Sequence, residues 1–468
     1  MHKSIDHFGD LKRIHLIGIG GSGMVGLARI LLKKGFLISG SDLVMTDELN
    51  TLKKIGARIQ LGHHPRYIKH TDLVVASSAI PRSNDELVFA RRNKKTIVPR
   101  AEMLSSLTKG YRSIAIAGSH GKTTTTSLIA NIFDEAKLSP TYVIGGQILS
   151  GQHSSKLGEG LHMVIEADES DGSFLHLQPE VAVITNIDND HLNFYNNDQI
   201  RLNQGFLNFI GNLPFYGYVL LNHDDKNIKK IKKNINRRFI TFGFSQKSDY
   251  QICIVDTKSD YQNFKIIKNE NDKEFSFQTS LIGIHNIINA SAAAIIGIEE
   301  GVNLKDIKRS LKGFSGVARR FERHRLRINE RELMLIDDYG HHPKEIELTI
   351  EATKHFCSLN SLCMIFEPHR FSRTKQLFNA FVDILKKIPH LYLLDIYPAS
   401  EKPIRGIHSK NLVKAINQAG GNAQLINSKQ ILRLVQGLDQ KFNFLLMQGA
   451  GRISHISASL VKKWNIKK

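Results

Sequence analysis

The feature that most restricts how this chain can fold is a glycine-rich turn, Gly118-Ser119-His120-Gly121-Lys122-Thr123, between an expected strand and an expected helix. Small and apolar residues at 113–117 favour a buried strand, and apolar side chains recur at helical spacing over 124–133. Glycine lets a backbone approach phosphate oxygens closely, and a helix start offers N–H groups and a positive dipole end to an anion. We therefore predict that the chain uses ATP or GTP, with Lys122 at the outer phosphates and Thr123 at a magnesium ion.

Length and composition limit the remaining classes of protein. The 468 residues suggest roughly three domains, and a hydrophobic share of 41% is enough for ordinary cores. The 3 cysteines form no Cys-x-x-Cys pair, so we expect a reducing cytoplasm rather than a disulfide framework or a zinc ribbon. Residues 1–9 do not resemble a signal peptide, and the run 13–32 contains glycines and Arg29, so no membrane insertion is expected. The net charge of +20 comes from scattered lysines and arginines without a recognisable nucleic-acid module, so no nucleic-acid partner is expected.

A second glycine pattern lies near the N-terminus. An apolar strand at 14–17 leads into Gly18-Ile19-Gly20-Gly21-Ser22-Gly23 and a helix over 24–34, and the next strand, 36–40, is followed by Asp42. This is the start of a dinucleotide-type βαβ unit, in which an acid follows the glycines by about 20 residues. Such a loop recognises a pyrophosphate. Taken alone, it also fits a nicotinamide oxidoreductase.

Acidic residues end two expected strands that follow the phosphate-binding turn. The run 162–165 leads into Glu166-Ala167-Asp168-Glu169-Ser170-Asp171, and the run 181–184 leads into Thr185-Asn186-Ile187-Asp188-Asn189-Asp190-His191. Carboxylates at strand ends beside a phosphate-binding loop are typical of a magnesium site. A solvated turn is the alternative for either cluster, but two such strands favour the metal.

Polar clusters follow strands again beyond residue 316. Strands expected at 333–336 and 361–366 end in Asp337-Asp338-Tyr339-Gly340-His341-His342-Pro343 and Glu367-Pro368-His369-Arg370-Phe371-Ser372-Arg373, and further strands are expected at 391–396 and from 444. Strands that alternate with helices predict a parallel sheet with ligands at its carboxyl ends. The sequence from 216 to 280 predicts irregular β structure without a chemical motif.

In this order the motifs resemble the Mur ligases over nearly the whole chain. The resemblance is carried by residues 18–24, 118–123, 166–171, the Asp190-His191 pair, His285-Asn286 with Asn289, 338–343 and 367–370. It implies an α/β fold of three domains: an N-terminal Rossmann-like UDP-sugar domain (1–105), a central P-loop ATPase-like domain (106–315) and a C-terminal Rossmann-like amino-acid domain (316–468). Within the family, the pattern is most similar to members that add L-alanine to UDP-N-acetylmuramate in peptidoglycan precursor synthesis.

The reaction implied by the resemblance has two steps. ATP phosphorylates the lactoyl carboxylate, and the amine of L-alanine then attacks the acyl phosphate, with Mg²⁺ as cofactor. The implied catalytic residues are Lys122, Glu166, His191, Asp338 and His341, and the implied metal ligands are Thr123, Glu166 and His191. ATP is implied at Gly118, Ser119, His120, Gly121, Lys122, Thr123, Thr124, Asn289, Arg319 and Arg320. The UDP-sugar is implied at Gly18, Gly20, Gly23, Asp42 and Arg100, and L-alanine at Tyr339, His369, Arg370 and Arg373. We expect a monomer or a weak homodimer.

Two positions depart from the family pattern, and two other functions compete. Arg452 and Asn193 stand where the family usually or often has an acid, and no chemical role is assigned to either. The first competing function is a sister ligase that attaches a recycled peptide to the same UDP-sugar, although the run 170–179 favours the alanine-adding members. The second is a nucleotide-regulated protein that holds nucleic acid on its basic surface.

Overall fold

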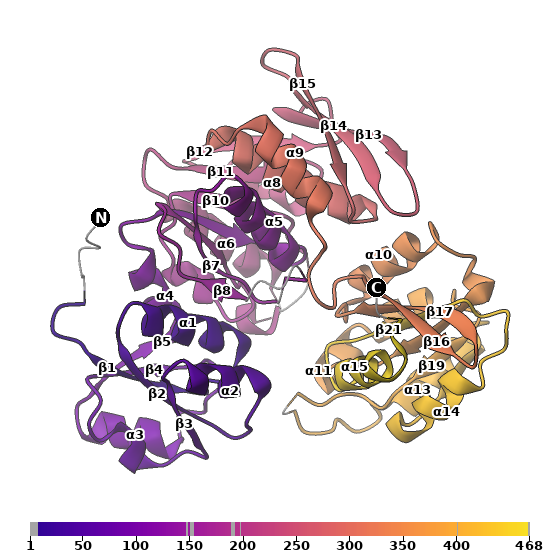
Figure 1. The fold of residues 1–468 in the computed structure, drawn as a ribbon, viewed down its shortest axis with the longest axis horizontal. Coiled ribbons are helices and arrows are strands. Elements are labelled where there is room, and N and C mark those ends of the chain that lie inside the picture. The colour runs from indigo at the N-terminus through magenta and orange to yellow at the C-terminus, as the bar shows by residue number, and fades with distance from the viewer. Residues whose placement is uncertain are drawn as a thin grey trace. The chain divides into compact units, whose positions relative to one another are not determined.

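The computed structural model describes residues 8–146, 148–149, 154–188, 192–196, 198–399 and 401–466. The strands form three sheets, and helices connect them in each (Figure 1). Contacts divide the chain into two compact units, of which the first comprises 1–257, 261–281 and 286–315, and the second comprises 258–260, 282–285 and 316–468. The first two sheets belong to the first unit and the third sheet to the second unit. Domain boundaries at 105 and 315 stay a prediction.

The first sheet is parallel and has the strand order β3-β2-β1-β4-β5. Its strands are β1 (Arg13–Ile17), β2 (Leu37–Asp42), β3 (Arg58–Leu61), β4 (Leu73–Ala76) and β5 (Thr96–Pro99). Its helices are α1 (Ser22–Lys33), α2 (Asp47–Lys54), α3 (Asp85–Arg92) and α4 (Arg100–Thr108). Apolar side chains bury β1 and β4 in the middle of the sheet. The strand order reverses between these two strands, which is where open α/β sheets bind ligands.

The second sheet has the order β15-β14-β13-β12-β11-β10-β6-β9-β7-β8. Its strands are β6 (Arg112–Ala117), β7 (Thr141–Val143), β8 (Ser155–Lys156), β9 (His162–Glu166), β10 (Val181–Ile184), β11 (Tyr218–Asn222), β12 (Arg238–Gly243), β13 (Tyr250–Thr257), β14 (Gln262–Lys268) and β15 (Lys273–Thr279). Its helices are α5 (Lys122–Glu135), α6 (Gln199–Gly211), α7 (Lys226–Lys232), α8 (Ile284–Glu299) and α9 (Leu304–Gly313), with 3-10 turns η2 (Ser173–His176) and η3 (Leu192–Tyr195). The phosphate-binding turn connects β6, in the buried middle of this sheet, to α5.

An ionic network ties the first residue of β6 to the residue that follows α8. The Arg112 guanidinium donates to both oxygens of Glu300, at 2.9 and 3.0 Å, and to Glu180 at 2.9 Å. The Tyr218 hydroxyl also donates to Glu300, at 3.1 Å. Burial alone would raise the pKa of Glu300, but hydrogen bonds from His162 and Arg112 outweigh it and lower the pKa to about 2.

The third sheet has the order β16-β17-β21-β18-β19-β20. Its strands are β16 (Glu322–Ile328), β17 (Arg331–Asp338), β18 (Leu362–Phe366), β19 (Leu391–Leu393), β20 (Ala423–Leu425) and β21 (Phe444–Gln448). Its helices are α10 (Pro343–Thr353), α11 (Phe371–Gln376), α12 (Phe378–Leu385), α13 (Ser409–Gln418), α14 (Ile431–Gln436) and α15 (Ile453–Trp464). The carboxyl ends of β17 and β18 carry the two polar clusters noted in the sequence.

The α/β class is confirmed, with three sheets in chain order, but the second and third sheets are mixed rather than wholly parallel. β13, β14 and β15 form antiparallel hairpins, and β16 pairs antiparallel with β17. The β16–β17 turn contains Asn329 and Glu330, both with positive φ, which is the two-residue geometry that closes a hairpin. β19 ends at Leu393, earlier than predicted, because its neighbour β20 is equally short. None of the helices in the described ranges combines the length and the apolar character needed to cross a bilayer.

Candidate active site

The turn between β6 and α5 has a backbone that glycine adopts with least strain. Gly118 and Gly121 have φ of +133° and +81°. A β-carbon at Gly118 would lie 2.2 Å from Thr185 Oγ1, and one at Gly121 would lie 2.5 Å from Asn289 Oδ1. Both glycines are therefore required by their neighbours as well as by the backbone. Asn289 lies against the turn and accepts a hydrogen bond from Thr125 Oγ1 at 3.3 Å.

Residues after β10 clamp the same turn, and the sequence analysis gave them no individual role. Asn186 Oδ1 accepts from His120 N at 2.9 Å, and the His120 carbonyl accepts from Asn186 Nδ2 at 2.9 Å and from Thr185 Oγ1 at 2.7 Å. Ser119 N donates to the Asn186 carbonyl at 3.1 Å. Their place after a buried strand was the only signal. These contacts hold the turn against the carboxyl end of β10.

Lys122 is held by two acceptors within hydrogen-bond distance. Its Nζ lies 2.6 Å from the Gly118 carbonyl and 2.6 Å from Glu169 Oε2. The Glu169 side chain is fully buried, and that of Lys122 is 12% exposed. Burial would lower the pKa of Lys122, but the negative charges of Glu169, Asp168 and Glu166 together outweigh it and keep the pKa above its ordinary value. Lys122 therefore presents a permanent positive charge, and Glu169 is a partner that the sequence analysis missed.

Two of the predicted metal ligands meet beside this turn. Thr123 Oγ1 donates to Glu166 Oε1 at 3.0 Å, and Glu166 Oε2 accepts from Gly145 N at 2.8 Å. A hydroxyl and a carboxylate are the hard oxygen donors that Mg²⁺ prefers, so the two residues fit that ion. His191, the third predicted ligand, lies outside the described residues. Thr124 is buried in the first turn of α5.

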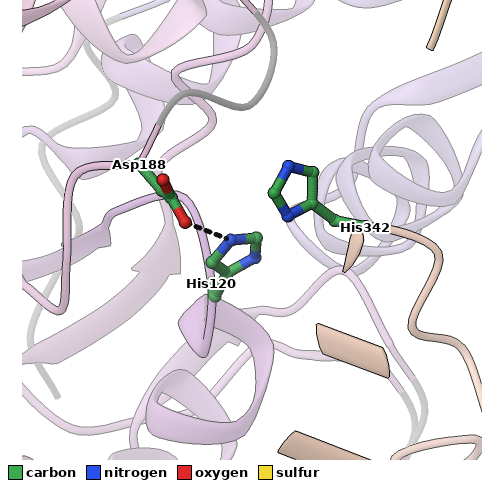
Figure 2. Close-up of side chains that lie close together, drawn as sticks. All are labelled: His120, Asp188 and His342. Carbon is green, nitrogen blue, oxygen red and sulfur yellow. Dashed lines mark ion pairs between the residues drawn. The ribbon is translucent and has the colours of Figure 1, made fainter. Parts of the chain in front are cut away.

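His120 points toward Asp188, which belongs to the second acidic cluster. Figure 2 shows this ion pair, in which His120 Nε2 lies 3.5 Å from Asp188 Oδ2. Asp188 N also donates to Ser119 Oγ at 2.8 Å. The carboxyl end of β10 is thus joined to the phosphate-binding turn by both backbone and side-chain contacts.

The five residues predicted for the UDP-sugar gather at the carboxyl end of β1. Asp42 Oδ2 accepts from Gly20 N at 2.8 Å, so Asp42 braces the glycine turn directly. Gly18 has φ of +75°, and its N–H donates to the Ser41 carbonyl at 2.9 Å. A β-carbon on Gly23 would lie 2.9 Å from Arg100 Nη1, which places this guanidinium beside the start of α1.

In the second unit, Arg319 and Arg320 enclose the ring of Tyr339. Each guanidinium carbon lies 5.0 Å from the ring centroid, within the range of a cation–π contact. Arg319 is also 3.6 Å from Asp337, and Arg320 is 3.8 Å from Glu345. The two arginines predicted for ATP are thus stacked on a residue predicted for L-alanine.

Most of the other residues predicted for L-alanine, together with His341, lie beside Tyr339 in one cluster of side chains. The ring of His341 lies 5.4 Å from that of Tyr339 and 5.3 Å from that of His369. His369 Nδ1 is 3.3 Å from Arg373 Nη1, and Arg373 is buried. Arg370 behaves differently, since its Nε donates to Glu401 Oε1 at 2.7 Å.

Asp338 lies beneath the cluster with its oxygens occupied. It accepts from the backbone N–H groups of Phe321 (2.9 Å) and Gly340 (2.8 Å) and from the side chains of Thr349 (3.1 Å) and Gln448 (3.0 Å). Burial raises the pKa of its carboxyl. These contacts join the start of β16, the end of β17 and the end of β21, so the geometry suits a bracing role.

Arg452, the departure from the family pattern, has a buried partner. Its Nε lies 3.5 Å from Glu367 Oε1, and Glu367 Oε2 accepts from Ile453 N at 2.8 Å. The guanidinium carbon is 5.9 Å from the ring of Tyr397, which stacks on His369 at 5.4 Å. Asn193 lies in η3, and its side chain is outside the described part of the structure.

The chain matches three models of one protein family, in order along its length. Residues 13–112 match the model described as "Mur ligase family, catalytic domain", 116–297 match "Mur ligase middle domain", and 319–451 match "Mur ligase, glutamate ligase domain". Together the three matches cover most of the chain.

Individual relatives agree with these matches over the full length. A UDP-N-acetylmuramate–L-alanine ligase from Ruthia magnifica is 44% identical over 97% of both chains, and one from Hydrogenovibrio crunogenus is 40% identical over 96% of this chain and 97% of its own. The crystal structure of a UDP-N-acetylmuramate–alanine ligase from Thermotoga maritima has a TM-score of 0.81 and 26% identity, and the alignment covers 97% of this chain and 99% of the other. The ordered motifs, the folded turns that carry them and this full-length similarity place the chain in the Mur ligase family.

Proposed function

We propose that this chain is an ATP-dependent ligase that joins L-alanine to the lactoyl carboxylate of UDP-N-acetylmuramate and releases ADP and phosphate. The observation that carries the proposal is similarity over the whole chain, at 39–44% identity, to proteins that bear this activity as their name. Such coverage includes the C-terminal part, where the family binds the acceptor. Use of ATP agrees with the folded phosphate-binding turn.

In the first step, a carboxylate oxygen of the substrate attacks the γ-phosphorus of ATP. A new O–P bond forms, the bond to the bridging oxygen breaks, and ADP leaves with the electron pair. Lys122 holds the outer phosphates, and the N–H groups at the start of α5 bind the phosphate chain. Thr123 and Glu166, with His191, would hold Mg²⁺, which would neutralise phosphate charge.

In the second step, the amine nitrogen of L-alanine attacks the acyl carbon. A C–N bond forms, the C–O bond to phosphate breaks with the electron pair leaving on phosphate, and the amine gives up a proton to solvent. Arg373 receives the alanine carboxylate, because it is a buried guanidinium in α11, the helix that follows β18. Tyr339 and His369 shape the pocket, Arg370 borders it, and Arg319 and Arg320 supply positive charge to the phosphoryl group. Asp338 and His341 hold this arrangement in place.

The UDP part binds at the carboxyl end of β1. The glycine turn at Gly18, Gly20 and Gly23 lets the diphosphate approach the start of α1, whose N–H groups bind it. Arg100 adds a positive charge beside the start of α1, and Asp42, which accepts from Gly20 N, keeps the turn in shape. Because ATP and UDP-sugars are made inside the cell, the reaction takes place in the cytoplasm, and the enzyme works as a monomer or a weak homodimer. Sedimentation velocity at micromolar concentration tests the oligomeric state.

Phosphate release tests the proposal. Purified protein is supplied with ATP, Mg²⁺ and UDP-N-acetylmuramate, and L-alanine, glycine, the recycled peptide and no acceptor are compared. We expect release that requires both the UDP-sugar and L-alanine and is lost in Lys122→Ala. Release with the peptide and not with alanine would assign the chain to the sister ligase, and no acceptor-dependent release by a folded, ATP-binding protein would refute ligase activity.

A further inference from the structure

We propose that Glu169 is a positioning residue that fixes the ammonium group of Lys122 for the outer phosphates of ATP; the proposal rests on the proposed function. The contact is direct, since Lys122 Nζ lies 2.6 Å from Glu169 Oε2. Glu169 stands three residues beyond the predicted metal ligand Glu166, so the same acidic cluster supplies one carboxylate to the metal and another to the lysine.

The hydrogen-bond donors of Lys122 determine how its ammonium group can be oriented. An ammonium group has three N–H donors. The Gly118 carbonyl and Glu169 accept two of them, each at 2.6 Å, and the described residues supply no third acceptor. Two fixed acceptors define where the nitrogen sits and leave one proton for a phosphate oxygen. Without Glu169, the four-carbon stem of the lysine would have a single tether.

The backbone of Glu169 is itself anchored. Its carbonyl accepts from the Tyr195 hydroxyl at 2.8 Å and from Gly172 N at 3.1 Å. A few residues later, Phe174 is fully buried and packs on Phe206 and Phe209 of α6, with ring centroids 5.3 and 5.1 Å apart. The carboxylate is thus attached to a backbone turn that hydrogen bonds and aromatic packing hold in place, as a positioning group requires.

A comparison within the same sheet separates this carboxylate from a structural one. Glu300 is also almost fully buried and paired with a base, and both of its oxygens accept hydrogen bonds. Glu169 Oε1 is buried and has no hydrogen-bond partner among the described residues. A buried carboxylate with one unsatisfied oxygen contributes little to the stability of the fold, because its hydrogen bonds do not fully offset the free-energy cost of its desolvation. Its place beside the phosphate-binding lysine points to function.

Two conservative substitutions separate position from charge. Glu169→Gln keeps an acceptor oxygen near Lys122 but removes the charge, whereas Glu169→Asp keeps the charge but withdraws the carboxylate by one methylene. A misplacement of about 1 Å can cost about 100-fold in rate. We therefore expect Glu169→Asp to lower kcat about 10- to 100-fold and Glu169→Gln to retain clearly more activity, with KM for L-alanine and for the UDP-sugar unchanged in both.

Glu300→Gln and Glu300→Asp are the matched controls, because they alter a buried ion pair at the other end of β6. They are expected to lower the melting temperature and leave kcat unchanged. The proposal is overturned if Glu169→Asp has wild-type kcat, if Glu169→Gln is the weaker variant, or if both fall alike. A wild-type protein without acceptor-dependent phosphate release would instead count against the proposed function.

A measurement that needs no turnover distinguishes a failure of this proposal from a failure of the proposed function. Acetic anhydride acetylates accessible lysine side chains, and mass spectrometry reports the rate at Lys122. In Glu169→Ala the rate should rise at least tenfold over wild type, because a side chain held by the Gly118 carbonyl alone leaves its 12% exposed position more easily and reaches the reagent. The Glu300 variants should label at the wild-type rate. An unchanged rate in Glu169→Ala would contradict the tether.

Discussion

Replacing Glu300 by glutamine should destabilise the first unit by an amount that depends on pH. Glu300 joins the residue after α8 to the first residue of β6 through Arg112, and its side chain is only 4% exposed. Its pKa is lowered from 4.5 to about 2, which corresponds to roughly 3 kcal/mol of stability at neutral pH, since each pH unit is worth about 1.4 kcal/mol. The carboxylate itself is almost fully buried, so solvent screening acts mainly on the Arg112 side chain, which is 33% exposed.

The direction of the pH dependence follows from the difference between the pKa of Glu300 in the folded and in the unfolded chain. The folded-state pKa lies below the unfolded one, so the stabilisation is complete above the ordinary pKa of 4.5 and is lost as the pH falls from there toward 2. The free energies of unfolding of wild type and Glu300→Gln, measured by urea denaturation at pH 7, should therefore differ by roughly 3 kcal/mol. At pH 3.5 this difference should be smaller. A gap under about 1 kcal/mol at pH 7, or one that widens on acidification, would show that the network does not stabilise the fold in this way.

Three further predictions concern the site. Gly121→Ala should weaken ATP binding at least tenfold in isothermal titration, because the new methyl group would lie 2.5 Å from Asn289 Oδ1 at a positive φ; wild-type affinity would mean that the turn relaxes freely. Removing Mg²⁺ with EDTA should abolish phosphate release, and Thr123→Ala should raise the Mg²⁺ concentration needed to restore it; an unchanged requirement would remove Thr123 from the metal site. Arg452→Asp should lower the melting temperature, because it sets a carboxylate against buried Glu367 in place of a guanidinium; a wild-type melting temperature would mean that the ion pair contributes nothing.

Local patterns allowed the fold class and the phosphate-binding turn to be predicted from sequence. Gly118 and Gly121 are only a few residues apart, so their spacing in the sequence was enough to predict a glycine turn, and the structure shows positive φ at both. The same holds for the glycines after β1, whose brace Asp42 follows at the expected distance. Hairpins such as β16–β17 were missed because a two-residue turn of Asn329 and Glu330 lacks the glycine that usually marks it.

The partners of the site residues could not be predicted, because they come from distant parts of the chain. Glu169 is 47 residues from Lys122 and Asn186 is 66 residues from His120, and only the order of strands in the sheet brings them together. Arg370 carried a binding role in the motif, yet Glu401 occupies its Nε. Sequence identifies which residue types meet a ligand, whereas the contacts that orient them depend on the tertiary fold.

Strand β6 has one further consequence, which concerns adaptation. Its first residue carries the ion pair with Glu300, and its last residue leads into the turn that holds Lys122. At about 3.3 Å per residue the two ends are roughly 17 Å apart, a separation at which the effects of substitutions usually add independently. Heat resistance can therefore be raised or lowered by changes around Arg112 while turnover stays constant, so a lineage that moves to a warmer or colder habitat can alter one property without the other.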